Sequence, residues 1–256
     1  MPIVQLIDSL RVEVYPNRDE MGKAAAVVAA DVINNAIAKN GESRVVFASA
    51  ASQSDFLKHL SGLKIDWSKV VGFHQDEWVG VSMDKEYCFG RFIKKHLFDI
   101  VNVGTAHYLD GMAVDIDLEC DRYAKLLAEK PVDLIILGIG ENGHIAFNEP
   151  HEADFNDPKA MKIITLDEKC RIQQKNDFGF SSIDEVPTNG ITVTIPFIMA
   201  VKNVITIVPT MRKAEAVANT LGGPISEKCP ASILRKKAGA TLYLDEDSAS
   251  DAPELK

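Results

Sequence analysis

Apolar positions in this sequence follow two alternating patterns, short β-branched runs and longer segments with helical spacing. The first long segment has apolar residues from Met21 to Ile37, with Asn17 placed to cap the helix and Gly41 placed to end it. Strands that alternate with helices in this way predict a parallel α/β sheet with helical crossovers. The predicted strands are Arg11–Tyr15, Ser43–Ala48, Val70–His74, Val132–Leu137, Lys162–Thr165, Ile191–Ile195, Val204–Val208 and Ala240–Leu244. Further helices are predicted from Ser52, near Tyr87–Leu97, and at Val114–Glu129, Arg212–Leu221 and Ala231–Lys236.

The chain length and the even distribution of these elements predict one domain over residues 1–256. A sequence of 256 residues with 46% hydrophobic residues is large enough to bury one sizeable core. No repeat, linker or low-complexity tract interrupts the pattern. The residues after Leu244 are polar and acidic, so we expect them to form a frayed tail.

Charge and cysteine content narrow the classes of function. The net charge of −9 disfavours binding to nucleic acid or to an anionic membrane surface, and no apolar run approaches the length of a membrane span. The N-terminal residues do not read as a secretion signal, so we expect a cytoplasmic protein. The four cysteines are scattered without C-x-x-C spacing, which predicts free thiols and neither a zinc site nor a disulfide framework.

Ligands of parallel α/β sheets bind at the loops that follow the carboxyl ends of strands. The loop after Leu137 reads GIGENGHIAFNEP and matches G-x-G-x-x-G, the fingerprint of dinucleotide binding. The match is weak, because it lies past mid-chain and Pro150 interrupts the helix that the fingerprint should open. The alternative is that Gly140 and Gly143 let the backbone approach a small ligand while His144 transfers a proton. A histidine that merely hydrogen-bonds its own loop would look the same in sequence.

The loop after His74 places two adjacent carboxylates, Asp76 and Glu77, at a strand end beside Trp78. A carboxylate desolvated by an aromatic ring has a raised pKa, which suits a general base. The competing interpretation is that these carboxylates only cap the next helix.

These motifs together resemble the glucosamine-6-phosphate deaminase (isomerase) family. The segments LGIGENGHIAFNEP and FHQDEWVG look like the family's histidine and aspartate loops, and DEVPTNGITVTIP, RKAEAV and GPISEKCPASIL follow in the family's order. The resemblance covers nearly the whole chain from the second strand onward. It implies a modified Rossmann-like α/β fold, a three-layer sandwich with helices on both faces of a parallel sheet, shared with 6-phosphogluconolactonases. It also implies isomerisation of an amino-sugar phosphate with loss of ammonia.

By resemblance, four residues carry the chemistry. His144 opens the sugar ring, Asp76 abstracts the proton at C2, and Glu149 orients the histidine. Asn142 stands where many members have an aspartate; an asparagine positions groups but relays no proton. The reaction needs no metal and no cofactor.

The predicted substrate contacts depart from the family in places. Lys213 matches the family's phosphate-binding lysine, although a solvated surface lysine is the alternative. Ser49 and Ser52 replace the usual threonine-glycine turn, and near Lys175 this chain lacks a family arginine, for which Arg171 is the candidate substitute. The complete set of predicted contacts is Ser49, Ser52, Glu77, Gly140, Gly143, Arg171 and Lys213.

The expected partner is a small amino-sugar phosphate, either glucosamine 6-phosphate or galactosamine 6-phosphate, and a homo-oligomer is left open. Two other functions remain: a hydrolase of 6-phosphogluconolactone, and a sugar-phosphate sensor without catalysis. The lactonase motif continues its glycine-histidine segment with threonine, alanine and serine, which differs from the sequence after His144.

Overall fold

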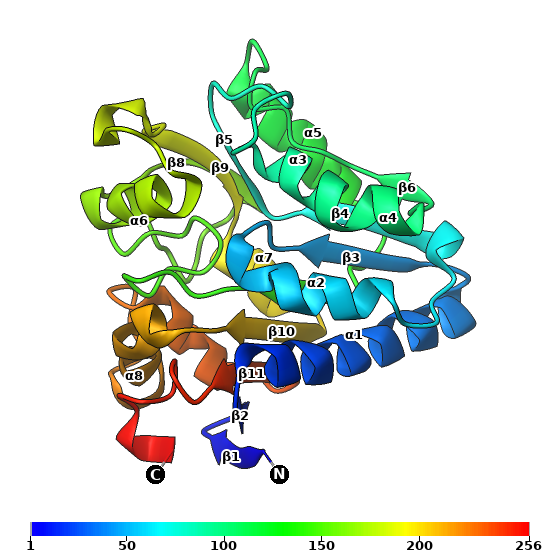
Figure 1. Cartoon of the computed structure of the whole chain (residues 1–256). Coiled ribbons are helices and arrows are strands. Elements are labelled where there is room, and N and C mark those ends of the chain that lie inside the picture. Colours follow the sequence, from blue (N-terminus) through cyan, green and yellow to red (C-terminus); the bar gives the residue numbers. More distant parts are fainter. Residues whose placement is uncertain (1, 256) are drawn as a thin grey trace.

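The computed structural model describes residues 2–255 and contains one large sheet of eight strands (Figure 1). The strand order is β1-β2-β11-β10-β7-β3-β4-β6, and every neighbouring pair is parallel except β1 with β2. Its strands are β1 (Ile3–Ile7), β2 (Leu10–Tyr15), β3 (Ser43–Phe47), β4 (Val70–His74), β6 (Thr105–Ala106), β7 (Leu134–Leu137), β10 (Asn203–Val208) and β11 (Ala240–Asp245). The predicted α/β fold with a mostly parallel sheet is confirmed.

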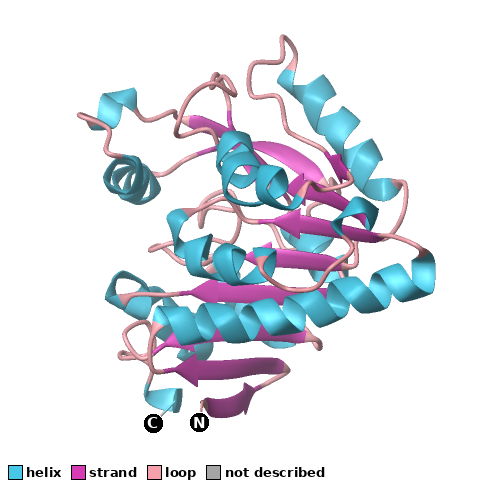
Figure 2. Ribbon diagram, turned by 45° about the vertical axis from the view of Figure 1, so that its right-hand side comes forward, coloured by secondary structure: helices cyan, strands magenta, loops and turns pink. Residues whose placement is uncertain are grey.

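Helices cover both faces of this sheet, because successive strand residues point to opposite sides. In β10, Ile205 and Ile207 pack with α1 and α2, whereas Val204 and Val208 pack with α5, α7 and α8. Figure 2 shows the long helix α1 running across one face of the stacked strands. No helix in the described part of the chain has the length and apolar character that a bilayer span requires. The helices are α1 (Arg18–Asn40), α2 (Ser54–Ser61), α3 (Phe89–Ile93), α4 (Asp99–Val101), α5 (Ile116–Ala128), α6 (Glu168–Phe178), α7 (Ile195–Ala200) and α8 (Ala214–Gly222).

A second, smaller sheet corrects the expectation that all strands are parallel. It consists of β5 (Asp76–Trp78), β9 (Asn189–Val193) and β8 (Met161–Thr165), which pair antiparallel in that order. Beneath it lies a separate apolar cluster that includes Trp78, Phe147 and Cys170. This sheet carries the segment between β7 and β10 and holds α6 above the carboxyl ends of the large sheet (Figure 1).

Several local predictions need correction. The edge strand β1 and the helix α6 were not predicted, and Ile195 opens helix α7 instead of ending a strand. The segment predicted as a helix at Ala231–Lys236 is a 3-10 helix that begins at Pro230. The helix predicted near Tyr87–Leu97 is α3, which continues as a π-helical stretch from Lys94 to Phe98.

The prediction of a frayed tail after Leu244 is wrong. Ser248 and Ala252 are fully buried and Leu255 is 6% exposed. The carboxylate of Asp245 accepts hydrogen bonds from the backbone N–H groups of Thr210 and Ser248 at 3.0 and 2.8 Å. The tail therefore packs beside the loop that leads into α8.

Candidate active site

A cavity of about 280 Å³ lies at the carboxyl ends of the parallel strands. The loops that follow β3, β4, β7 and β10 all contribute to its wall, as expected for a parallel α/β sheet. Side chains of α6 and α3 close the remaining sides. Of the predicted site residues, the lining includes Ser49, Ser52, Asp76, Gly140, His144 and Lys213.

The glycine-rich loop after β7 folds into tight turns and opens no helix, so the dinucleotide interpretation has no structural support. The backbone N–H of Gly140 donates to the carbonyl of His144 at 2.9 Å, which folds the loop back on itself. A Cβ at Gly140 would lie 2.2 Å from the imidazole ring of His144, so only glycine fits beneath that ring. Glycine at position 140 therefore lets the imidazole of His144 lie against the loop backbone at the cavity wall.

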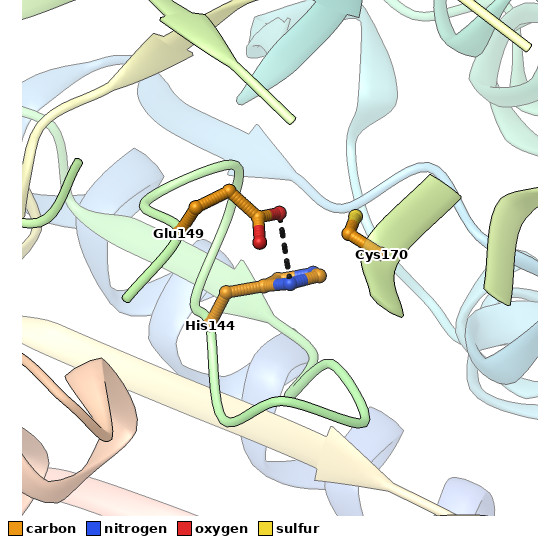
Figure 3. Close-up of side chains that lie close together, drawn as sticks. All are labelled: His144, Glu149 and Cys170. Atoms are coloured by element: carbon orange, nitrogen blue, oxygen red, sulfur yellow. Dashed lines mark ion pairs between the residues drawn. The ribbon is translucent and has the colours of Figure 1, made fainter. Parts of the chain in front are cut away.

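His144 faces a buried carboxylate (Figure 3). Its Nδ1 lies 3.1 Å from Oε1 of Glu149, which is fully buried, so the two groups are placed as an ion pair. Asn142 donates from Nδ2 to Glu149 at 2.6 Å and to Asp167 at 2.9 Å, and its Oδ1 accepts from the backbone N–H of His144. Burial raises the pKa of Glu149, but the charge of His144 and the surrounding hydrogen-bond donors outweigh it, so the net pKa is lowered. Glu149 is thus an anion beside the imidazole of His144.

Asp76 lies on the cavity wall at the start of β5 and is 5% exposed. Burial and the neighbouring charge of Glu77 raise its pKa well above the usual value. The ring of His74 lies beneath it, accepting from the backbone N–H of Leu109 at Nε2, so its Nδ1 donates to the carbonyl of Asp76. Burial lowers the pKa of His74 to about 4, which keeps this ring neutral. Asp76 is therefore a poorly solvated carboxylate of the kind that suits a general base.

Glu77 does not line the cavity, in contrast to its predicted role in binding substrate. Its carboxylate accepts from the backbone N–H groups of Trp78, Phe89 and Gly90, and from the thiol of Cys88. Glu77 thus satisfies the free N–H groups at the start of α3. Of the two adjacent carboxylates, Glu77 caps the next helix, as the competing interpretation of the sequence proposed, whereas Asp76 faces the cavity.

The other end of the cavity holds Lys213, which is 9% exposed. No described residue forms an ion pair or a hydrogen bond with its ammonium group, and burial lowers its pKa. The hydroxyl of Ser49 is also buried on this wall and has no hydrogen-bond partner among residues 2–255. The neighbouring Arg212 is already paired with Glu141 at 2.8 Å and with Asp177 at 3.0 Å. Lys213 is thus the cation available for an anionic ligand at this end.

Four other predicted residues lie outside the cavity lining, namely Glu149, described above, and Arg171, Gly143 and Asn142. Arg171 donates to the carbonyls of Ile183 and Val186 and so ties α6 to the loop that follows it. Gly143 has a φ of +85°, and a Cβ there would approach Sγ of Cys229 to 2.8 Å. Its role is therefore to allow the turn of the loop that carries His144. Asn142 acts through its bonds to His144 and Glu149, consistent with its predicted positioning role.

Sequence reasoning missed several lining residues. Gln75 and Gln53 each place a buried amide oxygen without a partner beside the cavity, and Gln173 and Asp177 reach it from α6. Gln75 precedes Asp76 in the loop after His74, which the sequence already marked as a candidate site loop, so Gln75 could have been predicted from its position. Gln173 and Asp177 could not, because the helix α6 that carries them was not predicted.

One cluster offers metal-binding donor atoms: His144, Glu149 and Cys170 place a nitrogen, an oxygen and a sulfur within 4.8 Å of one another (Figure 3). The thiol comes from the first turn of α6, above the histidine loop.

A buried carboxylate, a histidine paired with a second carboxylate, and a buried lysine face one cavity at the strand ends. This combination is characteristic of enzymes that transfer protons on a small anionic ligand. The chain belongs to the family described as "Glucosamine-6-phosphate isomerases/6-phosphogluconolactonase", whose family model matches residues 16–243. The resemblance drawn from the sequence motifs is confirmed.

Curated relatives support the deaminase branch of this family. The chain is 32% identical over 249 residues to the glucosamine-6-phosphate deaminase of Lactobacillus delbrueckii subsp. bulgaricus, covering 94% of this chain and 99% of that protein. It is 40% identical over 187 residues to the glucosamine-6-phosphate deaminase of Bacillus cereus, covering 73% of this chain and 70% of that protein.

Solved structures agree on the fold. A structure described as a monomeric glucosamine-6-phosphate deaminase superposes with a TM-score of 0.85 at 28% identity, covering 94% of this chain and 99% of that one. The 6-phosphogluconolactonase of Trypanosoma brucei superposes with a TM-score of 0.77 at 16% identity, with coverage of 94% and 97%. The second likeness concerns the fold alone.

Proposed function

We propose that this protein is a glucosamine-6-phosphate deaminase, which converts the amino-sugar phosphate and water into fructose 6-phosphate and ammonia. The observation that carries the proposal is that Asp76 and His144 line one cavity together with Lys213, a buried cation for which the described residues provide no counter-ion. The relatives in the deaminase branch support the same activity.

The 6-phosphate is assigned to the end of the cavity that holds Lys213. The ammonium group of Lys213 supplies one charge, and the unpartnered hydroxyl of Ser49 and the nearby Ser52 are placed on the same wall to donate hydrogen bonds. A phosphate there would satisfy two buried polar groups that otherwise have no partner, which makes the site favourable for an anion.

Ring opening is assigned to His144. The imidazole of His144 donates a proton to the oxygen of the sugar ring, and the Glu149 anion beside it holds the imidazole in place. The open chain then carries an aldehyde at C1, which acidifies the proton at C2.

Asp76 is assigned to the proton transfer. Its carboxylate removes the C2 proton to give an enolamine and returns a proton to C1, which leaves an imine at C2. Water adds to this imine and ammonia departs, so the ketose remains. The raised pKa of Asp76 brings its basicity closer to neutral pH, where general-base catalysis is most effective.

The test is ammonia release from pure protein with glucosamine, galactosamine and mannosamine 6-phosphates, measured beside hydrolysis of 6-phosphogluconolactone. The proposal expects ammonia from the gluco or galacto epimer and little lactone hydrolysis. Lactone hydrolysis without ammonia would favour the hydrolase, and ligand binding without either product would favour a sensor.

Two further properties belong to this proposal. The four free cysteines, three of them buried, fit a reducing cytoplasmic setting. A homo-oligomer stays a prediction, and light scattering on the purified protein decides it.

A further inference from the structure

The cluster of His144, Glu149 and Cys170 has features that the deaminase reaction does not use. The thiol of Cys170 is 1% exposed and lies against the histidine–carboxylate pair (Figure 3). Within residues 2–255, Nδ1 of His144 and Oε1 of Glu149 are both buried without a hydrogen-bond partner. Two buried polar groups without partners therefore lie close to each other and to a sulfur.

The donor set matches the chemistry of zinc. Zn²⁺ binds imidazole nitrogen, thiolate sulfur and carboxylate oxygen, and sites that remain open use three protein ligands with a fourth position free. In such a site neighbouring donors are about 3.5 Å apart, given bond lengths of about 2.0–2.3 Å. The donors here already lie within 4.8 Å of one another, so side-chain movements of about 1 Å would complete the geometry.

Charge balance also favours a divalent ion. A neutral imidazole, a carboxylate and a thiolate carry two negative charges, which one Zn²⁺ cancels, and a neutral buried cluster avoids the large cost of a buried net charge. On binding, the thiol proton of Cys170 leaves to solvent and the Zn–S bond forms, with no change in oxidation state. His144 lines the cavity, which gives the ion a path from solvent.

We propose that His144, Glu149 and Cys170 form a zinc-binding site that inhibits the enzyme when occupied. The ion takes the carboxylate away from the histidine and binds the imidazole, so His144 can no longer protonate the sugar ring oxygen and Glu149 can no longer orient it. The inhibition rests on the function proposed above, because the ion occupies two residues of the proposed active site and takes no part in the reaction.

Cobalt is the probe, because Co²⁺ adopts zinc geometry and reports a thiolate ligand by a charge-transfer band in the near ultraviolet. The purified protein is titrated with Co²⁺ and then with Zn²⁺, alongside Cys170→Ser and a control, Cys229→Ser. Cys229 lies behind the same loop, close to Gly143, but outside the donor cluster. This readout needs no turnover, so it stands whether or not the deaminase assay succeeds.

The proposal expects one Co²⁺ per chain with a thiolate band, displaced by Zn²⁺, and inhibition by Zn²⁺ that a chelator reverses. Cys170→Ser should lose the band and bind the metal at least tenfold more weakly, whereas Cys229→Ser should keep both. A wild-type cobalt spectrum without a thiolate band would overturn the site, and this result does not depend on whether a variant folds. A band that persists in Cys170→Ser or disappears in Cys229→Ser would equally overturn it.

Discussion

Two adjacent buried carboxylates should respond in opposite directions when their charge is removed. Asp76 faces the cavity, and no backbone N–H in the described part of the chain donates to its carboxylate. Glu77 accepts three backbone N–H groups and a thiol. The Asp76→Asn variant should therefore be more stable than the wild type, and Glu77→Gln should be less stable.

The sign of the effect at Asp76 follows from its pKa. Burial and the charge of Glu77 raise this pKa, so the folded protein binds the proton more tightly than the unfolded chain does. Stability consequently falls as pH rises from the unfolded value of about 3.9 through the folded pKa, and the loss is complete above it. A buried polar group without a partner costs about 1–3 kcal/mol, and more when it is charged, so at pH 8 we expect Asp76→Asn to be more stable by at least about 1 kcal/mol. At roughly 2–4 °C per kcal/mol, the increase in Tm is readily measured.

The magnitude for Glu77 follows from its hydrogen bonds. A glutamine keeps one acceptor oxygen but presents an amide N–H₂ where the second oxygen accepts from the backbone N–H of Gly90 at 2.8 Å. Losing a hydrogen bond to a charged group and leaving a buried donor unpaired costs about 1–3 kcal/mol.

Urea unfolding followed by circular dichroism at pH 5 and pH 8 measures both variants against the wild type. The gain of Asp76→Asn should be larger at pH 8 than at pH 5, since protonated Asp76 already resembles asparagine. Destabilisation by Asp76→Asn, or equal shifts of the same sign in the two variants, would refute the division of roles between these carboxylates.

Three other substitutions test the phosphate end of the cavity and the loop that carries His144. Lys213→Ala should raise KM for the phosphorylated substrate about 10–100-fold and change kcat less, as steady-state ammonia assays measure; an unchanged KM would remove Lys213 from the phosphate site. Asp177→Asn should lower this KM a few-fold, more at low salt, because it removes a negative charge close to the proposed phosphate position and leaves Glu141 as the remaining ion-pair partner of Arg212; a raised KM would assign Asp177 to substrate binding. Gly143→Ala should lower Tm, since φ is +85° and the new methyl group meets Cys229; an unchanged Tm would show that the loop adapts.

The sequence supported most of the large sheet because its buried strands are β-branched runs that are apolar on both faces. Helix α6 escaped prediction because its sequence, EKCRIQQKNDF, is mostly polar and has little apolar periodicity. Its position depends on the small antiparallel sheet and on contacts such as those of Arg171, which local sequence does not encode. The packing of the C-terminal segment was not predicted for a similar reason: Ala252 and Leu255 are isolated apolar residues among acidic ones and form no apolar pattern.

The site residues likewise fall into those that the sequence could predict and those that depended on tertiary structure. Asp76, His144 and Lys213 follow strand ends, and parallel strands bring their carboxyl ends to one edge, so the sequence was enough to place them together. The direction in which a side chain points could not be predicted in this way. Asp76 and Glu77 are neighbours, and only the pairing of β5 with β9 decides which of them faces the cavity. Gln173 and Asp177 required α6 to be positioned first.

The central claim is that Asp76 transfers the C2 proton while His144 serves ring opening, and hydrogen exchange tests it most directly. Fructose 6-phosphate and ammonium are incubated in deuterated water with wild type, Asp76→Asn or His144→Gln, and loss of the C1 proton signal is followed by NMR. The ketose enters through its open chain, so we expect exchange with wild type and with His144→Gln, and none with Asp76→Asn. Exchange by Asp76→Asn at the wild-type rate, or its loss in a folded His144→Gln that still binds ligand, would contradict the assignment.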